Sequence, residues 1–179
     1  MHADIERILL THDQILARVR ALAAQIAQTY SESVAGVTIV PILSGSIIFV
    51  ADLIRELPFR MKVALVHIST YPGATTSPGT PRTVMPPVGD VTGRDVLILD
   101  DILDSGRTLR HVRETLTALR PASIRTAVLL RKPGRASGEH ADFVGFDIED
   151  SFVVGYGLDY NDFYRNFPHI GVLRPELIR

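Results

Sequence analysis

Short apolar runs alternate along this chain with segments whose apolar residues recur every three or four positions. Runs of this length are typical of buried strands, and the wider spacing is typical of helices that bury one face. We therefore expect strands at residues 5–10, 37–43, 63–69, 96–99, 123–130 and 170–173. Strand, small-residue loop and helix in succession predict an α/β protein, with a doubly wound, mostly parallel sheet flanked by helices.

Three helices are expected between these strands. The first follows Thr11, because Gln14 three residues later completes a capping-box pattern. Its expected buried stripe consists of Ile15, Val19, Leu22 and Ile26. The second helix is expected at residues 46–57 and the third at 108–119. For the second, the expected buried residues are Ile47, Val50 and Ile54.

The segment from Pro72 to Gly89 breaks this pattern. It holds five prolines and three glycines among threonines and serines, so we expect a flexible loop with no regular element. A loop of this length inside a compact domain is a catalytic lid or a surface connection. Composition alone favours the surface connection, whereas the position of the loop directly after a strand end favours a lid.

Composition narrows the class of protein. The 179 residues fit one domain, 1–179, and the net charge of −1 gives no reason to expect a nucleic acid or an anionic membrane as partner. No apolar run reaches the roughly 18 residues of a membrane span, and the polar N-terminus does not resemble a signal peptide. The lack of cysteine excludes disulfides and thiolate metal sites and fits a reducing compartment, so we expect a cytoplasmic protein.

The stretch from Asp95 to Leu109 carries the clearest chemistry. An apolar strand delivers two acids, Asp100 and Asp101, and the sequence Asp-Ser-Gly-Arg-Thr at 104–108 then leads into a helix. Free amides and the helix dipole at such a turn favour phosphate. Because like charges repel, Asp104 is expected to face a group that carries or loses a proton. Its alternative role, from local sequence, is a helix N-cap.

Other polar residues also fall at the carboxyl ends of expected strands. They are Ser44 and Gly45, Tyr71, and Lys132. In doubly wound sheets ligands bind beyond these ends, so we expect one site that includes them and the acidic pair.

The sequence V-L-I-L-D-D-I-L-D-S-G-R-T-L at 96–109 resembles the phosphoribosyl-pyrophosphate motif of the type I phosphoribosyltransferases. The resemblance is closest to the hypoxanthine-guanine branch and extends from about Ile5 to Val172. It implies a small hood built from both terminal segments and transfer of phosphoribose to hypoxanthine or guanine, giving IMP or GMP and pyrophosphate. It also implies Mg²⁺ as cofactor and a homodimer or homotetramer.

The resemblance implies a role for each matching residue. Asp104 is the catalytic base that shares the proton on purine N7, and Asp100 and Asp101 face the ribose hydroxyls and are possible Mg²⁺ ligands. The residues implied to bind the 5′-phosphate are Ser105, Gly106, Arg107 and Thr108.

For the purine, the implied contacts are Lys132 to the 6-oxo group, stacking by Phe152 and the backbone of Val153. Alone, Lys132 would be read as an exposed lysine and Phe152 as core. Asp159 matches a Mg²⁺-associated carboxylate. We expect it to act together with substrate oxygens.

The pyrophosphate is expected at Ser44, Gly45 and Arg165, with Tyr71 in the closing loop. Arg165 alone would be read as a surface charge. Relatives usually carry a basic residue where this chain has Ser44, so weaker pyrophosphate binding is expected.

Two alternatives remain at this stage. One is transfer to another base, xanthine or a pyrimidine. The other is a non-catalytic regulator of the same fold that senses nucleotides or binds RNA, although no basic, aromatic-rich stripe supports RNA binding.

Overall fold

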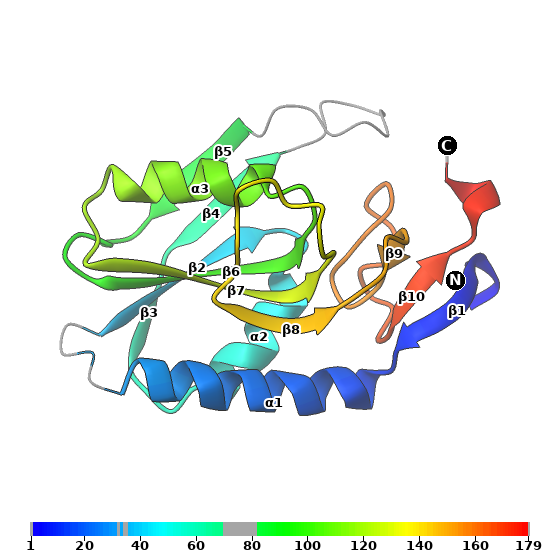
Figure 1. The fold of residues 1–179 in the computed structure, drawn as a ribbon, viewed down its shortest axis with the longest axis horizontal. Coiled ribbons are helices and arrows are strands. Elements are labelled where there is room, and N and C mark those ends of the chain that lie inside the picture. Colours follow the sequence, from blue (N-terminus) through cyan, green and yellow to red (C-terminus); the bar gives the residue numbers. More distant parts are fainter. Residues whose placement is uncertain (1, 32, 34–35, 70–81, 179) are drawn as a thin grey trace.

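A computed structural model describes residues 2–31, 33, 36–69 and 82–178. Its larger part is a seven-stranded sheet between helices, and its smaller part is a three-stranded sheet at one end (Figure 1). The strands of the larger sheet are β2 (Val37–Leu43), β3 (Met61–Val63), β4 (Leu65–Ser69), β5 (Arg82–Val88), β6 (Asp95–Leu103), β7 (Ser123–Arg131) and β8 (Phe143–Asp147).

The strand order confirms the doubly wound, mostly parallel sheet. The strands follow the order β5-β4-β2-β6-β7-β8, with β3 also paired to β2. All pairs are parallel except β4 with β5. From β2 the chain builds outward to β4 on one side, and from β6 it builds outward to β7 and β8 on the other. The direction of winding therefore reverses between β2 and β6, and a ligand crevice is expected beyond their carboxyl ends.

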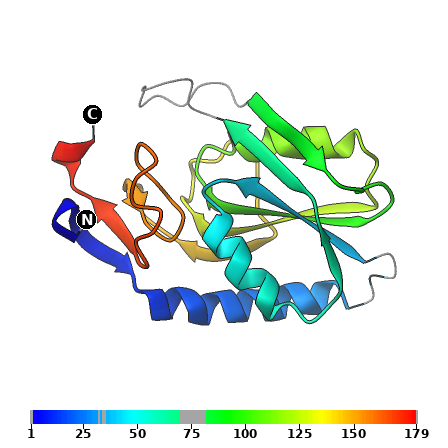
Figure 2. The same ribbon diagram turned by 180° about the vertical axis from the view of Figure 1, so that it is seen from behind.

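Helices cover both faces of this sheet. Helices α1 (His12–Thr29) and α2 (Ile47–Glu56) lie on one face, and α3 (Arg107–Thr117) lies on the other (Figures 1 and 2). Successive residues of β6 point to opposite faces, so Leu97 and Leu99 pack with α1 and α2 while Val96 and Ile98 pack with α3. The apolar run of β6 is thus buried from both sides.

Helix α1 confirms its sequence-based prediction. Thr11 and Gln14 form the capping box, and the predicted stripe is fully buried. In α2 the predicted face was partly wrong. Val50 is buried and Ile54 partly buried, but Ile47 is 53% exposed, and Phe49 and Leu53 fill the core instead. These two lie one turn apart and turn a larger apolar surface to the sheet than Ile47 offers.

Two strand predictions need correction. The strand expected at 63–69 is divided at Ala64 into β3 and β4, which pair with successive parts of β2. The expectation of no regular element between Pro72 and Gly89 is wrong for residues 82–88, which form β5. Because β5 is an edge strand with an irregular register, it tolerates prolines that a central strand excludes. Residues 72–81 of the predicted lid lie outside the described residues.

The smaller sheet confirms the predicted hood. It contains β1 (Ile5–Leu10), β10 (Ile170–Leu173) and β9 (Val153–Val154), paired antiparallel in that order. One-turn helices, η1 (His2–Asp4) and η2 (Pro175–Leu177), flank it. The hood has its own apolar cluster of Ile5, Val154, Phe167 and Leu173. No helix in the described part of the chain has the length and apolarity needed to cross a bilayer.

Candidate active site

Three segments meet at the carboxyl ends of β2 and β6. Gly45, in the turn after β2, lies so close to Asp101 that a Cβ there would overlap the carboxylate. Gly157, in the loop after β9, lies against the carbonyl oxygen of Gly45, and a Cβ at Gly157 would overlap that oxygen. Because both contacts require glycine, the pyrophosphate turn predicted around Gly45 is enclosed between the acidic pair and the hood.

The acidic pair lies within β6, which extends past the predicted strand end at Leu99 to Leu103. Asp100 is 8% exposed, and none of the ion pairs among the described residues involves Asp100 or Asp101. Burial, followed by the charge of Asp101, raises the pKa of Asp100 well above its usual range, and burial also raises the pKa of Asp101. Within the described residues, the acidic pair therefore has no ion-pair partner, and the only cation whose charge opposes the effect of burial on Asp101 is Arg165.

The predicted phosphate turn forms at the start of α3. Gly106 has a left-handed backbone with φ of 77°, and α3 begins at the next residue. The amides of the first helical turn have no helix carbonyl to bond, so they are available to an anion. Ser105 and Arg107 are exposed and Thr108 is partly exposed. The N-cap position is Gly106, so the alternative role of Asp104 as the N-cap is not observed.

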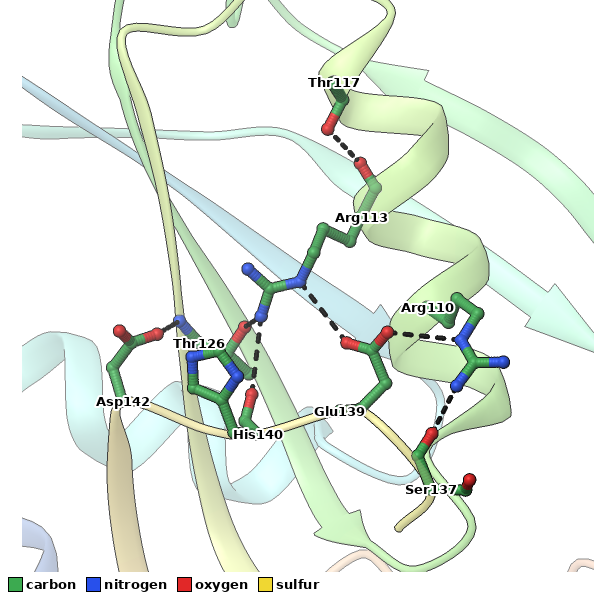
Figure 3. A network of polar contacts seen from close by, with 8 residues as sticks. All are labelled: Arg110, Arg113, Thr117, Thr126, Ser137, Glu139, His140 and Asp142. Carbon is green, nitrogen blue, oxygen red and sulfur yellow. Dashed lines mark hydrogen bonds and ion pairs between the residues drawn. The ribbon is translucent and has the colours of Figure 1, made fainter.

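A loop from the end of β7 packs on this turn. Glu139 lies against Gly106, where an added Cβ would meet the Glu139 side chain. Arg110 and Arg113 of α3 hold the Glu139 carboxylate at 3.3 and 3.5 Å, and Arg110 also donates to the carbonyl of Ser137 (Figure 3). The glutamate side chain is 11% exposed. The two arginines thus fix the loop to the helix that presents the phosphate turn.

Asp104 and Lys132, which the resemblance assigns to two atoms of the purine, lie close together, with 3.7 Å between the Lys132 Nζ and the Asp104 Oδ2. Lys132 is buried, and its amide donates to the carbonyl of Leu103 at 3.0 Å. The interpretation of Lys132 as an exposed lysine is therefore wrong. Its ammonium group also donates to Asp150 at 3.1 Å.

Arg135 closes a ring of charges around this pair. Its Nε donates to Asp104 Oδ1 at 2.6 Å, and its Nη1 donates to Asp150 Oδ2 at 2.5 Å. Hydrogen bonds from Lys132, and then from Arg135, lower the pKa of Asp150. The bond to Asp104, followed by that to Asp150, raises the pKa of Arg135. The two carboxylates, Asp104 and Asp150, and the two cations, Lys132 and Arg135, thus form a closed ring of ion pairs.

The hood supplies an aromatic face. Phe152 is 38% exposed and meets Tyr160 edge-on, with ring centroids 5.5 Å apart. Phe152 is therefore not ordinary core, and its ring is open to a stacking partner. Val153 is buried in β9, where it pairs with Val172 of β10.

Arg165 is tied into the hood loop. It donates to the carbonyl of Gly157 at 2.9 Å and contacts the carboxylates of Asp159 and Asp162 at 2.9 Å each. The second Asp159 oxygen accepts from the amide of Asp162 at 2.9 Å. The surface-charge interpretation of Arg165 does not hold, because its side chain is only 25% exposed and supports the glycine that contacts Gly45.

The remaining predictions have a mixed outcome. Ser44 is exposed beside Gly45, as a ligand-binding turn requires. Tyr71 lies outside the described residues. Sequence reasoning missed Arg135, Asp150 and Gly157. The basic, glycine-rich loop at 134–138 and the acids just before Phe152 were visible signals, but nothing in their spacing paired them.

Comparison with known proteins decides the family. A model of the phosphoribosyl transferase domain matches residues 7–161. The chain belongs to the phosphoribosyltransferase family. The match includes the acidic pair, the phosphate turn, Lys132 and Asp159. The fold observed here is accordingly the type I phosphoribosyltransferase fold.

Individual phosphoribosyltransferases resemble the chain over nearly its whole length. A hypoxanthine-guanine phosphoribosyltransferase from Mycobacterium avium is 41% identical over 97% of this chain and 88% of its own length. That of Bacillus subtilis (strain 168) is 39% identical over 99% and 98%. A crystal structure of a hypoxanthine phosphoribosyltransferase from Staphylococcus aureus superposes with a TM-score of 0.91 at 37% identity, covering 100% of this chain and 97% of that one.

Proposed function

We propose that this phosphoribosyltransferase joins hypoxanthine and/or guanine to 5-phosphoribosyl 1-pyrophosphate, with IMP or GMP and pyrophosphate as products. The observation that carries the proposal is the pair formed by Asp104 and Lys132 beside the phosphate turn. A 6-oxopurine has an N–H that an aspartate accepts and a carbonyl oxygen to which a lysine donates. The naming of the similar proteins supports the same substrate class.

The geometry supports a separate role for each group in the proposed reaction. A 5′-phosphate at residues 105–108 sets the ribose beside the buried carboxylates of Asp100 and Asp101. These carboxylates accept hydrogen bonds from the ribose hydroxyls and stabilise the positive charge that develops at C1 as pyrophosphate leaves. Asp104 takes the purine proton as the ring nitrogen attacks C1.

The same geometry selects the base. Lys132 is a buried donor, so it pairs with a 6-oxo group and is left unpaired by adenine, whose 6-amino group is itself a donor. Phe152 offers its exposed ring to the purine face. We therefore expect strong discrimination against adenine.

The residues present fit Mg²⁺. Asp100 and Asp101 are adjacent carboxyl groups with no ion-pair partner among the described residues, whereas Asp159 Oδ1 is paired with Arg165 and Asp159 Oδ2 accepts from the amide of Asp162. The described residues contain no group of three or more metal-ligating side chains, so the ion would need substrate oxygens. Asp100 and Asp101 would hold it, with Asp159 at the pyrophosphate side, and Mg²⁺ would neutralise charge on the leaving pyrophosphate.

The test is a turnover assay with phosphoribosyl pyrophosphate, Mg²⁺ and, in turn, hypoxanthine, guanine, xanthine, adenine and uracil. Turnover with hypoxanthine or guanine, lowered about 10²- to 10⁴-fold in Asp104→Asn, supports the proposal. Turnover with xanthine or uracil alone would establish the alternative base. Absence of turnover with every base, together with tight nucleotide binding, would establish the non-catalytic alternative.

Two coarser features complete the proposal. Because the chain has no cysteine and its substrates are metabolites of the cell interior, we place the reaction in the cytoplasm. That the protein is a homodimer or homotetramer stays a prediction. Light scattering on the purified protein measures the oligomeric state. The closing role of the loop at 72–89 also stays a prediction.

A further inference from the structure

The charged ring around Asp104 has an inner and an outer pair. The inner pair is Asp104 and Lys132, with side chains 37% and 10% exposed. The outer pair is Arg135 and Asp150, with side chains 47% and 58% exposed. The outer pair therefore covers the inner pair from the solvent side.

Each outer residue occupies one of the groups that the proposed reaction assigns to the purine. Arg135 Nε–H donates to Asp104 Oδ1, the kind of bond that the purine N–H would make. Asp150 Oδ1 accepts from Lys132 Nζ, the kind of bond that the 6-oxo oxygen would make. The purine N–H and the Arg135 Nε–H would share one acceptor oxygen of Asp104, and the guanidinium lies where the purine would have to approach, so the two donors compete.

Arg135 has a second place to go. Its Nη1 already bonds Asp150, so it keeps a carboxylate partner when it leaves Asp104. The preceding Gly134 has a left-handed backbone, and a Cβ there would meet no atom within 4 Å. Within the part of the chain that the structure describes, there is open space beside Gly134, whereas Glu139 further along is held by Arg110 and Arg113. The arginine can therefore shift without disturbing the phosphate turn.

We propose that Arg135 holds Asp104 when no base is bound, and that a 6-oxopurine displaces it onto Asp150. Arg135 and Asp150 are then positioning residues with opposite effects on the KM for the base. Arg135 raises this KM by competing for Asp104. Asp150 competes with the 6-oxo oxygen for Lys132 at 3.1 Å, but it draws Arg135 away from Asp104 at the shorter distance of 2.5 Å, so its net effect is to lower this KM. The inference rests on the proposed function, because it assigns Asp104 and Lys132 to the purine.

Two single variants test the opposite signs. Arg135→Met removes the competing donor and keeps the length of the side chain, so the KM for hypoxanthine should fall about 2- to 5-fold, the range for one partly exposed ion pair. Asp150→Asn removes the second carboxylate from the ring, so Arg135 and Lys132 both turn to Asp104. The KM for hypoxanthine should then rise by a similar factor. The KM for phosphoribosyl pyrophosphate should stay constant in both variants. The double variant should lie close to Arg135→Met, since Asp150 acts largely through Arg135.

The matched control is Arg131→Met. Arg131 forms a similarly exposed ion pair with Asp147, at 2.6 Å, near the same strand end and outside the ring. Its loss should leave both KM values unchanged. Arg135→Gln is a second variant that removes the charge, in case Arg135→Met does not fold. Thermal unfolding of every variant checks that each is folded before its KM is compared.

The outcomes separate this inference from the proposed function. A wild-type protein that turns over none of the bases would remove the proposed function. An active wild type whose base KM is unchanged, or raised, in Arg135→Met would overturn the inference and leave the function intact. The competition also predicts that the difference between Arg135→Met and wild type shrinks at high salt, because an exposed ion pair is screened.

Discussion

Lys132 is a buried lysine held by two carboxylates, and its burial decides what it can recognise. Its ammonium group lies 3.7 Å from Asp104 and 3.1 Å from Asp150. Replacing it with methionine keeps the volume and removes the donor. We expect kcat/KM for hypoxanthine to fall about 10- to 100-fold, the effect of losing a charge-assisted hydrogen bond. Discrimination against adenine should weaken at the same time. A steady-state assay with both bases checks this, and unchanged discrimination would contradict it.

Ser44 is the point at which this chain departs from the resemblance. It is exposed beside Gly45, in the turn expected to bind pyrophosphate, and it carries no charge. Ser44→Arg should tighten pyrophosphate binding by up to about tenfold, because it adds a charge-assisted donor. Ser44→Asn is the uncharged control and should change little. Product inhibition by pyrophosphate measures the effect, and equal inhibition of Ser44→Arg and wild type would exclude a role for charge at this position.

Among the elements, the loop after β9 holds the turn after β2 in place. Gly157 contacts the carbonyl of Gly45 and has φ of 104°, and Arg165 donates to its carbonyl. In the same loop the Tyr156 hydroxyl donates to Asp52 of α2 at 2.5 Å. Burial, followed by this bond, raises the pKa of Tyr156, so the hydroxyl stays protonated. The hood therefore supports both the pyrophosphate turn and the helix that follows it.

Gly157→Ala tests this support. The added methyl group would push against Gly45, so the KM for phosphoribosyl pyrophosphate should rise about tenfold, with a smaller change in the KM for the base. Gly93→Ala is the matched control, because Gly93 also has a positive φ, of 66°, but has open space where a Cβ would lie. Both variants should lose some stability from backbone strain. A similar change in KM for the two variants would show that strain alone is responsible.

What the sequence could predict follows from the range of each interaction. The capping box at Thr11 and the turn at Gly106 depend on neighbours within a few residues, and they were confirmed, whereas the strands at 63–69 and 96–99 were found with other bounds. The assignment of Asp104 and Lys132 to the same purine came from the family resemblance, but their direct ion pair was not predicted. The ring with Arg135 could not be predicted, because it joins side chains 31 and 15 residues apart. The strand β5 was missed because edge position, not composition, permits its prolines.

For the molecule as a whole, two acids of β6, Asp100 and Asp95, make the free energy of unfolding depend on pH in opposite ways. The pKa of Asp100 is raised in the fold, so the folded state keeps a proton that the unfolded chain has lost. Asp100 therefore destabilises the fold progressively as pH rises above about 4. Asp95 lies on the same strand, and bonds from Ser123 and Ser33 lower its pKa. Its contribution is complete above about pH 4 and is lost as pH falls through its folded pKa.

Two variants check these signs without Mg²⁺. Asp100→Asn should unfold at a higher temperature than wild type at pH 7, and this advantage should vanish towards pH 3. Asp95→Asn should unfold at a lower temperature at pH 7, and its deficit should also shrink as pH falls. Thermal or urea unfolding between pH 3 and 8 measures both. A neutral-pH loss of stability in Asp100→Asn would mean that its charge is compensated in the fold.

The pairing of β9 with β10, and of β10 with β1, has a consequence for synthesis. Phe152 precedes β9 and Val153 lies in it, and the partner of β9, residues 170–173, is synthesised long after the phosphate turn at residues 105–108. A nascent chain can therefore build the cradle for a sugar phosphate well before it can build a platform for a nucleobase. Products of translation interrupted before residue 170 would contain the residues for the sugar phosphate and lack the strand that supports the nucleobase platform.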